Sequence, residues 1–216
     1  SLDRRQRQMC IRDRVSARLF HLVSMGDVAA VMRDVIEAVA AWDSRRLAFH
    51  THRQAADFRL PSPANVVGNG FDLSNYTFQR PTDGPLGWAG RIAPEKGLED
   101  AAAAAALGEQ LLVWGLREDD AYARQVESSV PKGTIDWRGF RSTQELQQEM
   151  GHCRALINTP KWNEAYGNVV VEALACGVPV VAYDRGGPGE LICSGRTGWL
   201  VPVSYTHLRA HETDRY

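Results

Sequence analysis

The sequence predicts an α/β fold for most of the chain: a doubly wound, Rossmann-like sheet over residues 81–202, preceded by the remnant of another domain. Two observations support this prediction. From Leu86 onward, apolar strand-like runs alternate with amphipathic helical ones, which is the pattern of a parallel sheet covered by helices. The runs ALINTP (155–160) and VPVVAYD (178–184) are short, rich in apolar and β-branched residues, and bounded by Pro and Gly, as buried parallel strands are.

Strands and helices are expected to alternate through this unit. The strands are expected at 86–92, 110–116, 134–140, 155–160, 178–184 and 198–202. The helices are expected near 98–107, 119–129, 143–152, 168–176 and 187–193. The alanine run 101–106 is a strong helix former, and we interpret it as a packing surface rather than as low-complexity sequence.

The segment before this unit is too short for an independent domain with a full core of its own. A helix, a strand, a short helix and a further strand are expected at 28–41, 46–52, 53–58 and 64–69. We interpret residues 15–80 as the C-terminal remnant of an N-terminal domain with its linker. The junction is expected at RPTDGP, residues 80–85.

The most informative stretch is 162–190, in which Glu164 and Glu172 flank a Tyr-Gly-Asn turn. Gly167 would open a helix whose first amides are unpaired and carry positive partial charge, so that they can hold a diphosphate. The carboxylates can accept hydrogen bonds on either side of it, Glu172 from a ribose and Glu164 from a hexose. Two glutamates at this spacing could also simply face water. The flanking strands favour a binding site, because ligands of parallel sheets bind beyond the carboxyl ends of the strands, where Glu164 falls.

Both ends of the chain are expected to be foreign. Residues 4–14 (RRQRQMCIRDR) resemble one reading frame of a transposase-type sequencing adapter, and residues 203–213 (VSYTHLRAHET) resemble the same adapter read from the other strand. The codons ATG TGT ATA AGA GAC encode MCIRD, and the reverse complement of that adapter contains GTC TCT TAT ACA CAT, which encodes VSYTH. We therefore set residues 1–14 and 203–216 aside and expect a metagenomic fragment cut at both ends.

Composition indicates an ordinary globular chain, with 44% hydrophobic and 24% charged residues. The formal net charge of −1 includes the arginine-rich start, and without it the chain is more acidic, which argues against a nucleic-acid partner. No apolar run reaches the ~18 residues of a membrane span. Cys153, Cys176 and Cys193 lack metal-type spacing and are expected to be reduced structural thiols in a cytoplasmic protein. No metal or other cofactor is expected.

Several segments, in order, resemble the GT-B glycosyltransferases, in particular the large retaining family called family 4. VVGNGFDLSNY (66–76) resembles the asparagine-glycine-hydrophobic-aspartate segment at the end of that family's first domain. GRIAPEKGLEDA (90–101) resembles its glycine-arginine to lysine-glycine signature, and EAYGNVVVEALACGVPVVA (164–182) its two-glutamate motif. GGPGELI (186–192) and GRTGWLV (195–201) follow in the family's order.

This resemblance implies a GT-B fold in which the Rossmann-like C-terminal domain binds a nucleotide-sugar donor. Arg91 and Lys96 would contact the donor diphosphate, where two cations stabilise a leaving nucleoside diphosphate without a metal. Glu164 would hold the transferred sugar and Glu172 the ribose. Phosphates or sugar hydroxyls would contact the amides around Gly167, Asn168 and Val169. The base would lie beside the loop after the strand at 134–140, at Gly139, Phe140 and Arg141. Gly90 is a further donor-binding position.

A narrower likeness joins the segments 20–27, 47–58, 87–101 and 158–180, which look like cyanobacterial UDP-glucose:tetrahydrobiopterin glucosyltransferases. This likeness implies UDP-glucose as the donor and a pterin as the acceptor.

The family resemblance further implies transfer with retention of configuration, by a same-face displacement in which the leaving phosphate assists the incoming hydroxyl. A histidine or aspartate of the first domain usually sits near the reacting carbon in this family. His50 and His52 are available, but they fall on or after a late strand, and a structural hydrogen bond is the favoured interpretation. Because most of the first domain is expected to be missing, we expect the fragment to bind donor but turn it over poorly.

Other functions remain open at this point. A non-catalytic module that binds nucleotide sugars would not need Arg91, Lys96, Glu164 and Glu172 together. A GT-B epimerase or phosphorylase is a further alternative, although no lysine context suggests a Schiff-base cofactor. A dinucleotide-dependent oxidoreductase is disfavoured, because GWAGRI lacks the glycine-x-glycine-x-x-glycine turn. Fold alone does not decide among these functions.

Overall fold

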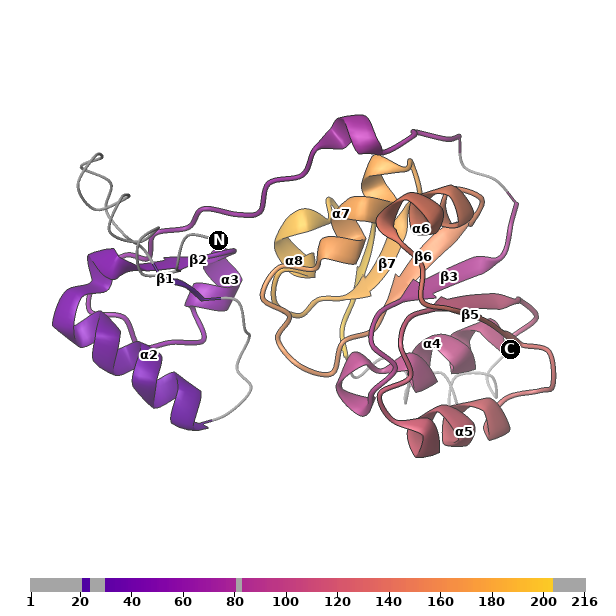
Figure 1. Ribbon diagram of the computed structural model, residues 1–216, viewed down its shortest axis with the longest axis horizontal. Helices are drawn as coiled ribbons and strands as arrows, with labels where there is room; N and C mark the ends of the chain where they lie inside the picture. The colour runs from indigo at the N-terminus through magenta and orange to yellow at the C-terminus, as the bar shows by residue number, and fades with distance from the viewer. Residues whose placement is uncertain (1–20, 24–29, 81–82, 204–216) are drawn as a thin grey trace, which may run out of the picture.

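The computed structural model describes residues 21–23, 30–80 and 83–203, arranged as a small lobe and a large lobe (Figure 1). The small lobe contains the first helices and strands of the chain, and the large lobe contains one open sheet with helices on both faces. Residues 59–80 lead from the small lobe over the top of the large one.

The large lobe is built on a six-stranded sheet in which every pair of neighbouring strands is parallel. Its strands are β3 (Leu86–Ala89), β4 (Leu111–Trp114), β5 (Ile135–Gly139), β6 (Ala155–Asn158), β7 (Val180–Tyr183) and β8 (Gly198–Val201). Their spatial order is β5-β4-β3-β6-β7-β8, which is the order of a Rossmann fold. The order in which strands are added to the sheet therefore reverses between β3 and β6. A crevice is expected there, because the loops after these two strands lead to opposite faces of the sheet.

Helices cover both faces of this sheet (Figure 1). They are α4 (Leu98–Ala105), α5 (Asp120–Ser128), α6 (Thr143–Met150), α7 (Asn168–Ala175) and α8 (Pro188–Leu191). Because successive strand side chains point to opposite faces, β4 contributes to two cores. Leu111 and Val113 pack with α4 and α5, whereas Leu112 and Trp114 pack with residues of α6 and α7. The predicted packing role of the alanine run is confirmed, since Ala101, Ala102 and Ala105 are fully buried.

The small lobe has a separate, smaller core. Its elements are β1 (His21–Val23), α2 (Ala30–Asp43), β2 (Leu47–Phe49) and α3 (His52–Ala55), with β1 and β2 paired in parallel. Val23, Ile36, Leu47, Phe49 and Phe58 are the larger side chains buried in it. This core is small, and its assignment to the end of a preceding domain stays a prediction.

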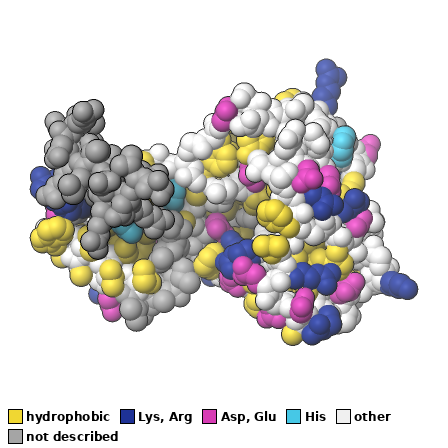
Figure 2. Space-filling model, viewed as in Figure 1, with side chains coloured by type: hydrophobic (Ala, Val, Ile, Leu, Met, Phe, Trp, Pro, Cys, Tyr) yellow, Lys and Arg dark blue, Asp and Glu magenta, His cyan; other side chains and the backbone are white. Residues whose placement is uncertain are grey.

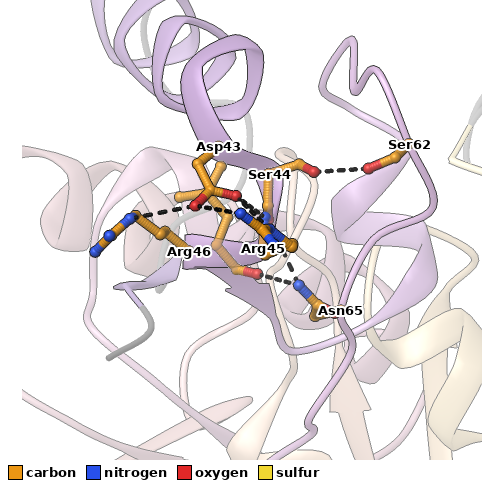
Figure 3. A network of polar contacts seen from close by, with 7 residues as sticks. Asp43, Ser44, Arg45, Arg46, Ser62 and Asn65 are labelled. Carbon is orange, nitrogen blue, oxygen red and sulfur yellow. Dashed lines mark hydrogen bonds and ion pairs between the residues drawn. The ribbon is translucent and has the colours of Figure 1, made fainter. Parts of the chain in front are cut away.

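A polar network ends α2 and fixes the start of β2 (Figure 3). Asp43 accepts a hydrogen bond from the backbone N–H of Arg45 at 3.2 Å and so caps a short 3₁₀ turn, Ser44–Arg46. Its carboxylate also pairs with the guanidinium groups of Arg45 and Arg46. Asn65 Nδ2 donates to the carbonyl of Leu47 at 2.9 Å, which ties the segment after α3 to β2.

Most predicted elements of the large lobe are confirmed with shorter bounds, and two features of the small lobe differ from prediction. The strand expected at 64–69 is wrong: only an isolated parallel bridge forms there, between Phe49 and Val66. The side-chain amide of Asn65 donates a hydrogen bond to the carbonyl of Leu47, and the pairing with β2 does not extend beyond the single bridge. The strand β1 was not expected. The adapter-like residues 1–14 and 204–216 lie outside the described residues, and their foreign origin stays a prediction.

Candidate donor-binding site

Two adjoining cavities open next to β3 and β6, where the strand order of the sheet reverses. The first has a volume of about 380 Å³ and the second about 270 Å³. The residues that line both cavities lie at the end of β3, directly after it, or at the start of α7; they are Ala89, Gly90, Arg91, Asn168 and Val169. Lys96 and Glu164 line only the first cavity, and Phe140, Arg141 and Glu172 line only the second. The predicted site residues, with the exception of Gly139, are thus gathered around one crevice.

The wall shared by the cavities contains the start of α7. Gly167 precedes this helix with φ +99°, a left-handed conformation that favours glycine, and no side chain caps the helix. The first amides of a helix have no acceptor within it, so the amides at Asn168 and Val169 form a positive end directed at the crevice. Such a helix start can bind a phosphate.

Lys96 and Glu164 form an ion pair in the first cavity. The Lys96 Nζ lies 2.7 Å from Glu164 Oε2, and the two side chains are 18% and 19% exposed. The indole N–H of Trp162 donates to the same oxygen at 3.0 Å, and Lys96 Nζ lies 4.8 Å from the centre of the Trp162 ring. A partly buried carboxylate next to an ammonium group is suited to bind a ligand that carries both hydroxyls and negative charge.

Backbone contacts hold the loops of Lys96 and Glu164 against each other. The Thr159 hydroxyl donates to the carbonyl of Gly97 at 2.7 Å. The Lys161 N–H donates to the carbonyl of Glu95 at 2.9 Å. A Cβ at Gly97 would lie 2.1 Å from the carbonyl oxygen of Thr159, so only glycine allows this approach. The ion pair is therefore positioned by the fold rather than by flexible side chains alone.

The loop of Glu164 is also fixed from two other sides. The Gly187 N–H donates to the carbonyl of Glu164 at 2.7 Å, and a Cβ at Gly187 would lie 2.0 Å from the Tyr166 carbonyl oxygen. From the small lobe, the Thr51 hydroxyl donates to the carbonyl of Ala165 at 2.9 Å. Gly187 and Glu164 thus lie next to each other beyond the carboxyl ends of β6 and β7.

Glu172 lies one turn inside α7, on the second cavity. Burial raises the pKa of this carboxyl group, and the Tyr76 hydroxyl, which donates to Glu172 Oε1 at 3.4 Å, opposes that shift only in part. The Tyr76 pKa is raised as well, first by burial and then by the nearby Glu172 charge. A carboxylate held in a half-buried cavity wall with one long hydrogen bond is poised to accept further donors from a ligand.

We expect Glu172→Gln to leave the protein as stable as, or more stable than, the unmodified chain at neutral and alkaline pH. Because the folded-state pKa of Glu172 is raised above its unfolded value, the folded state binds the proton more tightly, and stability falls as pH rises through the folded pKa. Glutamine removes this loss of stability, because it carries no charge to bury. Thermal melts of both proteins at about pH 8 and about pH 5 should show a difference that shrinks at the lower pH.

Glu149→Gln is the matched control with the opposite sign. Burial acts to raise the pKa of Glu149, but hydrogen bonds from Arg141 (2.6 Å) and Trp114 (2.8 Å) outweigh it and lower the pKa. Its ionised form therefore stabilises the fold, and Glu149→Gln should reduce the melting temperature at about pH 8. A clear loss of stability in Glu172→Gln at that pH would contradict the interpretation that the ionised Glu172 carboxylate destabilises the fold.

The remaining predicted residues lie around the second cavity. Arg91 is held by Glu118 at 2.6 Å and Glu95 at 2.9 Å, and the hydrogen bond from Arg91 to Glu118 is the main reason that its pKa is raised. Phe140 is 66% exposed at the cavity rim. Gly139 does not line either cavity among the described residues; its carbonyl accepts from the Gly115 N–H at 3.0 Å and so supports the cavity wall from behind.

The small lobe and the segment 59–80 each contribute to the first cavity a side chain that the sequence did not assign to ligand binding. His50 lines the cavity at 8% exposure, and its Nδ1 lies 3.1 Å from the Gly68 carbonyl oxygen, as the structural interpretation expected. Asn69 Nδ2 donates to Asn168 Oδ1 at 2.8 Å across the crevice. His52, in contrast, is exposed at the start of α3. The signal for Asn69 was its place in the 66–76 motif, but its partner could not be read from sequence.

No group of three or more His, Cys, Asp or Glu side chains in the described part of the chain is arranged to hold a metal ion. No helix among the described residues has the length and apolarity to cross a membrane. On the face shown in Figure 2, basic and acidic side chains of the large lobe are interspersed, unlike the continuous basic surface of a nucleic-acid binder.

Comparisons with known proteins agree with this geometry. A family model described as "Glycosyl transferases group 1" matches residues 81–211. The chain is 35% identical over 140 residues to a GDP-mannose-dependent alpha-mannosyltransferase of Mycobacterium tuberculosis, covering 61% of this chain and 35% of that protein. It is 30% identical over 207 residues to alpha-maltose-1-phosphate synthase of Mycolicibacterium smegmatis, covering 88% and 49%. The chain thus spans half or less of the length of these relatives.

A solved structure shows the same fold. Anabaena Alr3699/HepE, determined in complex with UDP-glucose, superposes with a TM-score of 0.67 at 22% identity, covering 80% of this chain and 54% of that one. At that identity the likeness establishes the architecture, which is that of the GT-B glycosyltransferases. The family match covers more than half of the chain and includes the crevice at β3 and β6. The chain therefore belongs to the glycosyl transferases group 1 family.

Proposed function

We propose that this chain carries the donor-binding site of a retaining glycosyltransferase, which transfers a hexose from a nucleotide sugar to a hydroxyl acceptor. One observation carries the proposal. Glu164 and Glu172 lie in two adjoining cavities, and the wall between them consists of the α7 start with Gly90 and Arg91. A sugar nucleotide has the same order of groups: a hexose, a diphosphate, and a nucleoside.

Each group of the donor has a matching surface in this arrangement. In the first cavity, Glu164 accepts hydrogen bonds from hexose hydroxyls. At the shared wall, the amides of Asn168 and Val169 bind the diphosphate together with Arg91 and Lys96. In the second cavity, Glu172 accepts from the ribose, and the base lies along Phe140 and Arg141. A pair of cations at the diphosphate favours departure of the nucleoside diphosphate, because negative charge develops there in the transition state.

The proposed reaction is a same-face displacement. The bond between the sugar C1 and the diphosphate oxygen breaks, a bond from C1 to the acceptor oxygen forms, and the acceptor proton passes to the leaving phosphate. We propose UDP-glucose as the donor and a pterin as the acceptor. The UDP-glucose complex of the fold relative supports the donor, whereas the mannosyltransferase relative uses GDP-mannose, so the two donors are to be compared.

A thermal-shift panel tests this proposal on the full chain. UDP-glucose, GDP-mannose, ADP-glucose and UDP would each be added over a range of concentrations, with free glucose as the control. A donor at 100 times its dissociation constant should stabilise the fold by about 2.7 kcal/mol, which raises the melting temperature by roughly 5–10 °C. A cooperative melt that no nucleotide or nucleotide sugar shifts would refute the proposal.

A further inference from the structure

Resting on the proposed function, we infer that Trp162 is a positioning residue: it fixes the Glu164 carboxylate so that one oxygen stays available to a hydroxyl of the bound sugar. The sequence gives Trp162 no such role, and its ring does not line either cavity among the described residues. Any effect on the ligand therefore acts through its neighbours.

The two oxygens of Glu164 have different surroundings. Oε2 accepts from the Lys96 ammonium at 2.7 Å and from the Trp162 indole N–H at 3.0 Å. Among the described residues, Oε1 has no protein donor, while the side chain lines the first cavity. A carboxylate with one oxygen saturated and the other open presents a defined acceptor to the cavity.

Trp162 becomes more important when the diphosphate binds. Lys96 and Glu164 line the same cavity as the shared wall, where the diphosphate is proposed to bind, so an incoming diphosphate competes for the Lys96 ammonium group. The ring of Trp162 holds that ammonium from a second side, at 4.8 Å, through a cation–π contact. As Lys96 shares its charge with the phosphates, the indole N–H is the contact that keeps the Glu164 carboxylate in place.

Trp162→Phe tests this inference, because phenylalanine keeps an aromatic face for Lys96 and removes only the N–H donor. We expect the dissociation constant for UDP-glucose to rise by about 5- to 30-fold, less than for the direct loss of a charged hydrogen-bond partner of the ligand because Trp162 acts through Glu164, and that for UDP to change less than about twofold. GDP-mannose and GDP would be titrated in parallel. Trp199→Phe, on the exposed face of β8, is the matched control and should change neither ligand's affinity.

Two further variants separate positioning from a general structural role. Trp162→His restores a ring N–H and should recover part of the lost affinity for UDP-glucose. In a Glu164→Ala background, Trp162→Phe should have no further effect on UDP-glucose, because the group that it positions is gone. Equal losses for UDP-glucose and UDP, or an undiminished effect without Glu164, would overturn the inference. If the unmodified chain binds UDP and GDP but neither nucleotide sugar, the inference fails alone; if it binds none of them, the proposed function fails as well.

Discussion

Replacing Lys96 by alanine is expected to weaken binding of UDP and UDP-glucose by about 10- to 150-fold, the equivalent of a lost charge-assisted hydrogen bond of 1.5–3 kcal/mol. Lys96 lines the first cavity, and its ammonium group is only partly exposed, paired with Glu164 at 2.7 Å. Its removal takes a cation from the proposed diphosphate position. It also leaves the Glu164 carboxylate without its counter-charge, which repels the phosphates. Calorimetric titration of the variant with both ligands measures the effect.

Lys161→Ala is the matched control for this prediction. Lys161 is likewise a paired lysine, 2.8 Å from Glu99 and 3.0 Å from Asp100, but it lines neither cavity among the described residues. Its truncation should change UDP affinity by less than about threefold, since the effect of a partly exposed ion pair is small. Similar losses in the two variants would mean that Lys96 acts through stability or overall charge and not at the diphosphate.

Gly115→Ala is expected to destabilise the protein by more than about 3 kcal/mol, from backbone strain and overpacking together. Gly115 follows β4 with φ +146°, and a Cβ there would lie 1.8 Å from the carbonyl oxygen of Gly90. The strands β3 and β4 would have to separate where the Gly90 N–H donates to the Trp114 carbonyl at 3.0 Å. Since Gly90 belongs to the shared wall of the cavities, donor binding should be lost with stability. Urea unfolding followed by circular dichroism measures the first effect.

Gly108→Ala separates crowding from backbone strain. Gly108 also has a positive φ, +127°, but no atom lies within 4 Å of the position of its Cβ. The variant should therefore show the backbone strain alone, about 1–3 kcal/mol, and keep its donor affinity. If Gly115→Ala unfolds at the same urea concentration as Gly108→Ala, the close packing of β4 against Gly90 does not contribute to the stability of the protein.

The large lobe was predictable because its sequence pattern is local. Runs such as ALINTP and VPVVAYD announce buried strands through composition and bounding residues, and β6 and β7 lie within them. The small lobe was less predictable from its sequence. In segment 64–69 the apolar pair Val66 and Val67 is flanked by Asn and Gly, which strands disfavour, and only Val66 pairs with β2. Pairing partners depend on where the chain travels afterwards, which propensity does not record.

The residues of the site also fall into two groups: those that a local motif predicts, and those that only the fold brings together. Glu164 and Glu172 could be selected from sequence, since both surround a single helix start. The pairing of Lys96 with Glu164, 68 positions apart, follows from the order of strands in the sheet, and that of Asn69 with Asn168, 99 positions apart, from the path of the segment between the lobes. A single sequence contains no direct signal for such contacts. For this reason the structure, and not the motif, indicates how Trp162 could act.

The most direct test of a nucleotide-sugar site at the β3–β6 crevice is a calorimetric titration of the chain with UDP-glucose and UDP, repeated with Glu172→Ala. The site as described predicts saturable binding of both ligands and a loss of at least about 10-fold in affinity on removal of the Glu172 carboxylate, which we propose accepts from the ribose common to both. Undiminished binding by a folded Glu172→Ala protein would contradict the placement of the nucleoside in the second cavity. Absence of binding by the folded unmodified chain would contradict the donor site itself.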